Sequence, residues 1–273
     1  MDIYLKPDCK NCFALCCVAL PYAKSADFAF NKDGGEPCRN LCIDNRCSIH
    51  DKLSDKGFRG CVSYECFGAG QHVSQSIYKG NDWRNNMEKS SEMFAVFPIV
   101  QQLHEMLWYL TQALGLTETK PFQKELKNAY DETVQMTNRT SEEILSLDIP
   151  SHRETVNDLL VTTSDLVRKD FVQMNTKRKI KKGLDYLGAN LKGADLKGAN
   201  FRGALLIAAN LSNTDLRKVD FIGADLRDTD LSNADLTDCI FLTQFQANSA
   251  KGNQYTKLPY YLNTPDHWLS VTK

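Results

Sequence analysis

The sequence predicts a multidomain α and β protein with a cysteine-rich metal-binding module, a helical middle region and a solenoid. Nine of the ten cysteines fall in the first 66 of 273 residues. Apolar residues then recur three or four apart, as they do on one face of a helix. From about residue 185 a five-residue pattern repeats without a break. The predicted parts are 1–80, 81–184, 185–245 and a capping C-terminal tail, 246–273.

Charge and hydropathy exclude several classes of function. The chain has 33 Lys and Arg against 34 Asp and Glu, a net charge of −1. This balance is not typical of proteins that coat nucleic acid or anionic membranes. No apolar run reaches the ~18 residues of a membrane-spanning helix. The apolar run 12–23 contains three cysteines and a proline, which is not typical of an export signal. We therefore expect a cytoplasmic protein with no membrane partner, and we disfavour a nucleic-acid partner.

The cysteines of the first part have the spacing of a metal site. Cys9-x-x-Cys12 is followed by adjacent Cys16 and Cys17. A C-x-x-C pair places two thiolates on one turn, and cysteines from other loops complete a tetrahedral site. Thiolates select zinc, iron–sulfur clusters or copper(I) over magnesium and calcium. Two other interpretations are a disulfide scaffold, which needs an oxidising compartment, and buried thiols that serve only as core residues. The remaining cysteines of this part are Cys38, Cys42, Cys47, Cys61 and Cys66.

This arrangement resembles a bacterial cysteine-cluster family, called YkgJ-like, that is described as zinc- or iron-chelating. Its hallmark is a C-x-x-C, a Cys-Cys pair, a lone Cys, a C-x-I-(Y/H) step and a closing Cys pair. The Arg-Pro common before the closing pair is replaced here by residues 55–60, and Cys42 lies outside the pattern. The resemblance implies zinc or an iron–sulfur cluster as cofactor. The metal ligands that it implies are Cys9, Cys12, Cys16, Cys17, Cys38, Cys47, Cys61 and Cys66.

The middle part, 81–184, is predicted to form three or four packed helices. Two capping boxes, Thr140 with Glu143 and Ser151 with Glu154, mark helix starts. The basic run 177–182 is expected to be a solvated helix end. We expect the helices and the solenoid to have cores that are separate from the cysteine module. Helical spacing is clearest at Phe97, Val100, Leu103, Leu107, Leu110 and Leu114, and then at Phe122, Leu126, Tyr130 and Val134.

The third part, 185–245, contains eleven consecutive five-residue units, each with a Leu or Phe two positions after a small or slim residue. A period of five fits neither a helix nor a strand, so each unit must form a repeated corner. Asn and Asp between the apolar positions suit turns. The large residues are Leu191, Leu196, Phe201, Leu206, Leu211, Leu216, Phe221, Leu226, Leu231, Leu236 and Phe241.

These units resemble the pentapeptide-repeat pattern A-(D/N)-(L/F)-x-x. The resemblance implies a right-handed quadrilateral β-helix whose Leu, Phe and Ala-type side chains point inward, with Cys239 as a core residue. It also implies ~20 residues per coil, so that Asp195, Asp215 and Asp235 would stack in a column. Leu205 and Ile240 stand where the pattern has Asn or Asp.

The sequence contains no recognisable motif for a nucleophile, a general base and a third residue that orients the base, so enzymatic function is unsupported. We predict a bacterial metal-binding pentapeptide-repeat protein that acts as a protein-interaction or regulatory scaffold for an unknown protein partner. One alternative is a redox or metal-delivery and maturation factor that uses the cysteines. Another is a DNA mimic that modulates topoisomerases, as some pentapeptide proteins do. The short repeat array disfavours DNA mimicry. Just under three coils stack only ~13 Å high, whereas DNA advances ~34 Å per turn.

Overall fold

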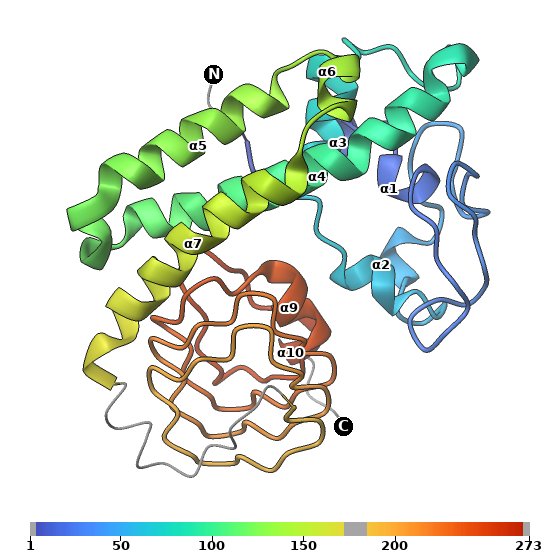
Figure 1. The fold of residues 1–273 in the computed structure, drawn as a ribbon. Coiled ribbons are helices and arrows are strands. Elements are labelled where there is room, and N and C mark those ends of the chain that lie inside the picture. Colours follow the sequence, from blue (N-terminus) through green and yellow to red (C-terminus); the bar gives the residue numbers. More distant parts are fainter. Residues whose placement is uncertain (1–3, 172–184, 270–273) are drawn as a thin grey trace. The chain divides into compact units, whose positions relative to one another are not determined.

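The computed structural model describes residues 4–171 and 185–269, and the chain divides into two compact units, residues 1–160 and 161–273 (Figure 1). We call them unit 1 and unit 2. Helix α7 (Ile149–Arg168) runs from one into the other. The basic run 177–182 lies outside the described residues. Within residues 4–171 and 185–269, no helix is both long and apolar enough to cross a membrane.

The cysteine-rich part of unit 1 is made of loops and short helical turns, joined by the antiparallel bridges Tyr22–Lys32 and Leu41–Cys47. Such short elements cannot bury much surface on their own. The turns are the 3₁₀ segments Cys9–Asn11 and His50–Lys52, the helices α1 (Leu15–Val18), α2 (Arg59–Ser63) and α3 (Ala69–Gln71), and the π-helical turn His72–Ile77.

The first long helix of unit 1 follows the predicted periodicity, with Phe97, Val100, Leu103, Leu107 and Leu110 buried. In the next helix the prediction holds only for Leu126: Tyr130 and Val134 are partly buried, and the buried face is completed by Ala129, Thr133 and Thr137. The capping box at Thr140 is confirmed. The predicted start at Ser151 is wrong, because the Asp148 carboxylate accepts the Ser151 N–H at 3.1 Å and the helix begins at Ile149. The elements are α4 (Met87–Gly115), a 3₁₀ turn (Thr117–Phe122), α5 (Gln123–Thr137), α6 (Ser141–Leu145) and α7.

The cysteine-rich part and helix α4 share one hydrophobic core, which corrects the expectation of separate cores. The indole Nε1 of Trp83, four residues before α4, also donates to the Phe13 carbonyl at 2.9 Å. Buried contacts of this kind make the two parts one folding unit. The shared core contains Leu15, Val18, Ala69, Val73, Tyr78, Trp83, Met93, Val96, Phe97, Val100 and Ile144.

Unit 2 contains the predicted stack of coils. Parallel bridges join residues twenty apart, such as Asp195–Asp215 and Asp215–Asp235, so four five-residue units make one coil. Each face contributes a single bridged residue, and for this reason the described coils contain isolated bridges rather than long strands. The large side chains of successive coils, such as Leu216 and Phe221, are fully buried, and the Cys239 side chain is buried among them as predicted.

The tail after residue 245 closes the last coil. In helix α9 (Gln244–Ser249), the Gln246 amide donates to the carbonyls of Phe221 and Ala224 at 2.7 and 2.9 Å. Lys251 and Lys257 form parallel bridges to the coil before them. In helix α10 (Asp266–Leu269), the buried Trp268 donates to the Ala250 carbonyl at 3.0 Å.

Candidate metal-binding cysteine groups

Eight cysteines of unit 1 can be sorted into two groups by the thiols that act on one another: Cys66 and Cys9 raise the pKa of Cys12, whereas Cys17, Cys38 and Cys47 raise that of Cys61. The two groups touch, because Cys17 also raises the pKa of Cys9 and of Cys16. All ten cysteines of the chain are free thiols. We call the first the α3 group because it lies against helix α3, and the second the Tyr22 group because it surrounds that side chain. The α3 group is Cys9, Cys12, Cys16 and Cys66. The Tyr22 group is Cys17, Cys38, Cys47 and Cys61.

The α3 group gathers around Gly70. A Cβ atom on Gly70 would lie 2.7 Å from Cys12 Sγ, so only glycine leaves room for this sulfur, while Cys66 Sγ would be in ordinary contact at 4.0 Å. The turn that carries Cys9 is held against α3 by a hydrogen bond of 3.1 Å from Asp8 N–H to the Gln71 side chain. Cys12, Cys16 and Cys66 pack on the shared core, which fixes this group to helix α4.

The Tyr22 group is assembled by loop contacts. Cys38 N–H donates to the Cys17 carbonyl at 2.9 Å, and the bridge Leu41–Cys47 returns the chain to the same place. Cys61 N–H donates to the Phe58 carbonyl at 3.0 Å, and the Phe58 ring lies 6.4 Å from that of Tyr22. The Tyr22 hydroxyl donates to Cys38 Sγ at 3.3 Å.

Mutual proximity and burial set the electrostatics of both groups. Burial, with a smaller contribution from nearby Cys66 and Cys9, raises the pKa of Cys12 to about 11. Burial likewise raises the pKa of Cys61 to about 12, with Cys17, Cys38 and Cys47 as the neighbours that add to the shift. A bound cation would reverse this effect, because it stabilises the thiolate form of every nearby cysteine.

The two groups meet at the adjacent residues Cys16 and Cys17, whose sulfurs lie 4.0 Å apart. Their hydrogen bond raises the pKa of Cys16 and lowers that of Cys17. The buried ammonium of Lys32 also lowers the Cys17 pKa. This ammonium donates to the carbonyls of Val18, Asp33 and Glu36 at 3.0, 2.9 and 3.0 Å. It is therefore a fixed positive charge beside the Tyr22 group.

The two remaining cysteines are Cys42, which is exposed and lies near Cys47, and Cys239, which is buried in unit 2. In the described part of the chain, no three Cys, His, Asp or Glu side chains are already close enough to hold an ion. Metal binding by the eight thiols therefore remains a proposal, in which the sulfurs of each group move together around the ion. Sequence reasoning missed Gly70, Tyr22 and Lys32. Small residues next to Cys66, such as Gly68 and Gly70, are a sequence signal of a close approach.

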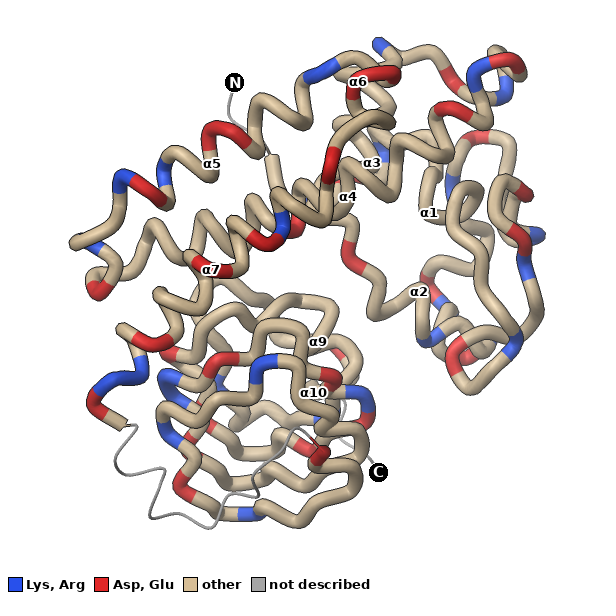
Figure 2. The backbone as a smooth tube through the Cα atoms, viewed as in Figure 1, with Lys and Arg blue, Asp and Glu red and all other residues tan. Residues whose placement is uncertain are grey.

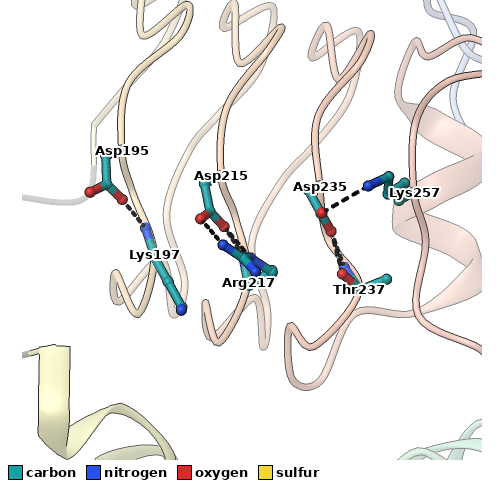
Figure 3. Close-up of polar contacts among 7 residues, drawn as sticks. All are labelled: Asp195, Lys197, Asp215, Arg217, Asp235, Thr237 and Lys257. Carbon is teal, nitrogen blue, oxygen red and sulfur yellow. Dashed lines mark hydrogen bonds and ion pairs between the residues drawn. The ribbon is translucent and has the colours of Figure 1, made fainter.

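A polar column follows one face of the coils in unit 2, as Figure 3 shows. Arg217 forms a bidentate pair with Asp215, at 2.9 and 2.6 Å, and Lys257 Nζ lies 3.4 Å from Asp235. The third acid of the column, Asp195, accepts the Lys197 N–H at 3.3 Å. Figure 2 shows basic and acidic residues interspersed in both units. The column is therefore largely neutralised, unlike the continuous negative charge of a DNA backbone.

The sequence is similar to those of known proteins. The family described as pentapeptide repeats matches residues 187–221 and 204–241, in eight copies. The coils of unit 2 thus define a pentapeptide-repeat protein. The uncharacterized protein YybG of Bacillus subtilis (strain 168) is 60% identical over 264 residues, which cover 97% of this chain and 95% of YybG. The chain belongs to the family of YybG. A pentapeptide repeat protein of known crystal structure, from Nostoc Pcc 7120, is 26% identical and covers 35% of this chain and 87% of its own, with a TM-score of 0.15.

Proposed function

We propose that this protein is a cytoplasmic metal-binding scaffold. Unit 1 binds zinc or an iron–sulfur cluster through its two cysteine groups, and unit 2 presents a surface to a protein partner. The observation that carries the proposal is that cysteines far apart in the sequence are neighbours in unit 1: Cys12 lies near Cys9 and Cys66, and Cys61 near Cys17, Cys38 and Cys47. Gly70 leaves room for the Cys12 sulfur. Thiolate sulfur is the donor that zinc and iron–sulfur clusters take in proteins.

The bound metal would stabilise a region that has little regular structure of its own. The loops between α1 and α2 contain two isolated bridges and one 3₁₀ turn. Structural zinc supplies on the order of 10 kcal/mol of folding free energy in small domains. The metal would neutralise the thiolates and join these loops to α1, while Tyr22 and Lys32 orient the sulfurs from outside.

The decisive experiment is anaerobic purification of the full chain, followed by elemental analysis and an absorption spectrum. Stoichiometric zinc, or iron with sulfide and a visible charge-transfer band, would support the proposal. Metal-free protein that does not take up added Zn²⁺ or Fe²⁺ under reducing conditions would refute it. A metal that exchanges readily with a chelating peptide would instead favour the delivery alternative.

The surface for a protein partner is suggested by Leu205. Asp or Asn at the equivalent positions accepts the N–H two residues later, as Asp225 does from Arg227 at 3.1 Å, which stabilises the corner. Leucine cannot accept this bond. The other exception, Ile240, is 3% exposed and fills the core, but Leu205 is 47% exposed. A second exposed leucine lies in the neighbouring coil. Leu187 is 64% exposed and comes two residues after Asp185, which forms a parallel bridge with Leu205. A partner with an apolar side chain would cover this corner.

Leu205→Asn should leave the stability of the fold nearly unchanged. The new turn hydrogen bond contributes about 1 kcal/mol and offsets the loss of a half-buried leucine. Leu205→Ala is the matched control, because it removes the same contacts without restoring the bond, and it should lower stability by about 1 kcal/mol. Thermal unfolding of both variants should show that the Leu205→Ala protein is less stable than the Leu205→Asn protein. Equal losses for both would show that the corner has no missing turn bond.

Gly70→Ala should weaken metal binding by at least tenfold, a loss that corresponds to about 1.4 kcal/mol. The added methyl would lie 2.7 Å from Cys12 Sγ and would displace that sulfur from its group. Gly115→Ala is the control, since nothing lies within 4 Å of a Cβ there. Competition with a colorimetric zinc chelator measures both variants. Wild-type affinity in the Gly70 variant would place the metal away from α3.

A further inference from the structure

We infer that His104 is a positioning residue for Cys66, because it holds the turn that surrounds the Cys66 sulfur through the backbone carbonyl of Phe67. The bearing of this role on metal binding rests on the proposed function, whereas the placement of the thiol does not. The inference adds a residue of helix α4 to the set that arranges the cysteines of unit 1.

A strained turn directly follows Cys66. Phe67 has a φ of 50° and Gly68 a φ of 82°, so two successive residues adopt the left-handed region of backbone conformation. Glycine tolerates this region, but it is an outlier for a bulky aromatic residue. Strain of this kind persists only where the surrounding contacts fix the conformation, and it is typical of functional sites.

The turn surrounds the Cys66 sulfur with hydrogen-bond donors. Burial raises the pKa of Cys66, whereas hydrogen bonds from the backbone N–H groups of Gly70 and Gly68 lower it. The Cys66 carbonyl in turn accepts the Ala69 N–H at 2.9 Å. Backbone N–H groups of a turn that point to one place favour an electron-rich atom there. The left-handed turn therefore fixes where the Cys66 sulfur lies.

Three contacts hold Phe67 in this conformation. His104 Nδ1 lies 2.8 Å from the Phe67 carbonyl oxygen. The Glu65 carboxylate accepts the Phe67 N–H at 3.0 Å. The Phe67 ring is buried, and its centre lies 5.9 Å from that of the Trp108 ring. His104 and Trp108 both belong to α4, so the long helix of the shared core supports the turn. Of the two hydrogen bonds, the one from His104 joins the backbone of the turn to another element.

The hydrogen bond of His104 defines the tautomer of its ring. A carbonyl oxygen can only accept, so Nδ1 carries the proton and Nε2 keeps a lone pair. Nε2 has no hydrogen-bond partner among the described residues, and the side chain is fully buried. Burial lowers the pKa of His104 to about 4, so the ring is neutral at neutral pH. Within the described part of the chain, the ring of this histidine thus forms its hydrogen bond to the turn after Cys66.

Loss of this bond would allow Phe67 to relax to a negative φ. The N–H groups of Gly68 and Gly70 would then turn away from the Cys66 sulfur. Because Cys66 is a neighbour of Cys12, the released thiol would leave its place among the cysteines of the α3 group.

The test measures how well Cys66 is protected in the reduced, metal-free, full-length protein. The rate of labelling by N-ethylmaleimide is followed by peptide mass spectrometry and divided by the rate in urea, which corrects for intrinsic reactivity. His104→Phe and His104→Gln should label Cys66 about tenfold faster than the wild type, the effect of one lost hydrogen bond. His104→Asn should label like the wild type, because its amide nitrogen is as many bonds from Cα as Nδ1 is. Labelling of Cys47 should be unchanged in every variant.

His152→Phe is the matched control. His152 is also a buried histidine of unit 1, but its ring donates to the Thr133 hydroxyl of α5 at 2.8 Å. This variant should unfold at a lower temperature and keep the wild-type labelling of Cys66. Fast labelling of Cys66 in His104→Asn, or in His152→Phe, would overturn the positioning role. If the His104 variants do not fold, ¹⁵N NMR of the wild type decides: a proton on Nδ1 of His104 supports the inference, and a proton on Nε2 overturns it.

Titration of the same variants with Zn²⁺ connects this role to the proposed function. His104→Phe should bind zinc about tenfold more weakly than the wild type, and His104→Asn should bind it equally well. Equal zinc affinity in both variants would show that the His104 bond does not position a metal ligand. A wild type that binds no zinc would refute the proposed function, while the labelling of Cys66 would still decide the role of His104. The two failures are therefore distinguishable.

Discussion

Removal of the proposed metal with a chelator is expected to loosen the first half of α4 together with the cysteine loops. The reason is the shared core, in which Leu15 and Val18 of the cysteine region pack with Met93, Val96 and Phe97 of the helix. Loss of the thiolate–metal bonds would release α1, and the apolar side chains of α4 would lose their cover. Hydrogen–deuterium exchange before and after chelation should show a tenfold or greater rise in exchange for peptides within 87–100.

Unit 2 is the internal control for this experiment, because its buried columns lie within the coils themselves. Exchange in residues 196–241 should be unchanged by the chelator. If α4 kept its full protection while the loops 19–66 became exposed, the cysteine region would fold independently of the helix. The shared core would then contribute little to stability.

Leu216→Lys is expected to destabilise unit 2 by more than about 4 kcal/mol. Leu216 is fully buried and stacks in an inward column with Leu196 and Leu236, which are also buried. An ammonium group at this position would be desolvated without a partner. Because every coil contacts only its neighbours, the loss should affect the coils on both sides. Thermal unfolding followed by circular dichroism should show a large drop in Tm or an unfolded unit 2.

The matched control is Thr237→Lys, which places the same side chain on the outside of the next coil. Thr237 is exposed and stands in the column of Lys197 and Arg217, next to Asp235 (Figure 3), so a lysine at this position would extend from an outward face beside an acid. Its Tm should stay within a few degrees of the wild type. Similar losses in both variants would mean that inward and outward positions are assigned wrongly.

The solenoid was largely predictable from the sequence, because a five-residue corner leaves little conformational choice. The period placed Leu216 inside and stacked Asp195 on Asp215, and both features are confirmed. The start of α7 was not predictable from the Ser151 capping box alone, because Asp148 competes as a cap three residues earlier. Two acceptable caps close together leave the boundary to tertiary packing.

The cysteine region was harder to predict because its contacts are not periodic. Spacing indicated that the thiols would gather, but it left open how eight of them divide. Their grouping depends on loop hydrogen bonds such as that from Cys38 to Cys17, which leave no regular trace in sequence. The shared core was missed for a similar reason. Leu15 and Val18 lie in a four-residue helix, which is too short to show an amphipathic pattern.

The interval of twenty residues between bridged positions also restricts how the chain can change in length. Duplication of one complete coil would keep every acid, cation and inward leucine of the stack on the same face and in the same column. Duplication of a single five-residue unit would keep each side chain inside or outside, but it would rotate all later faces by one quarter of the coil. Asp235 would then leave the column of Asp215, and the exposed corner of Leu205 would meet a different face. Gain or loss of repeats in this family should therefore occur in multiples of four.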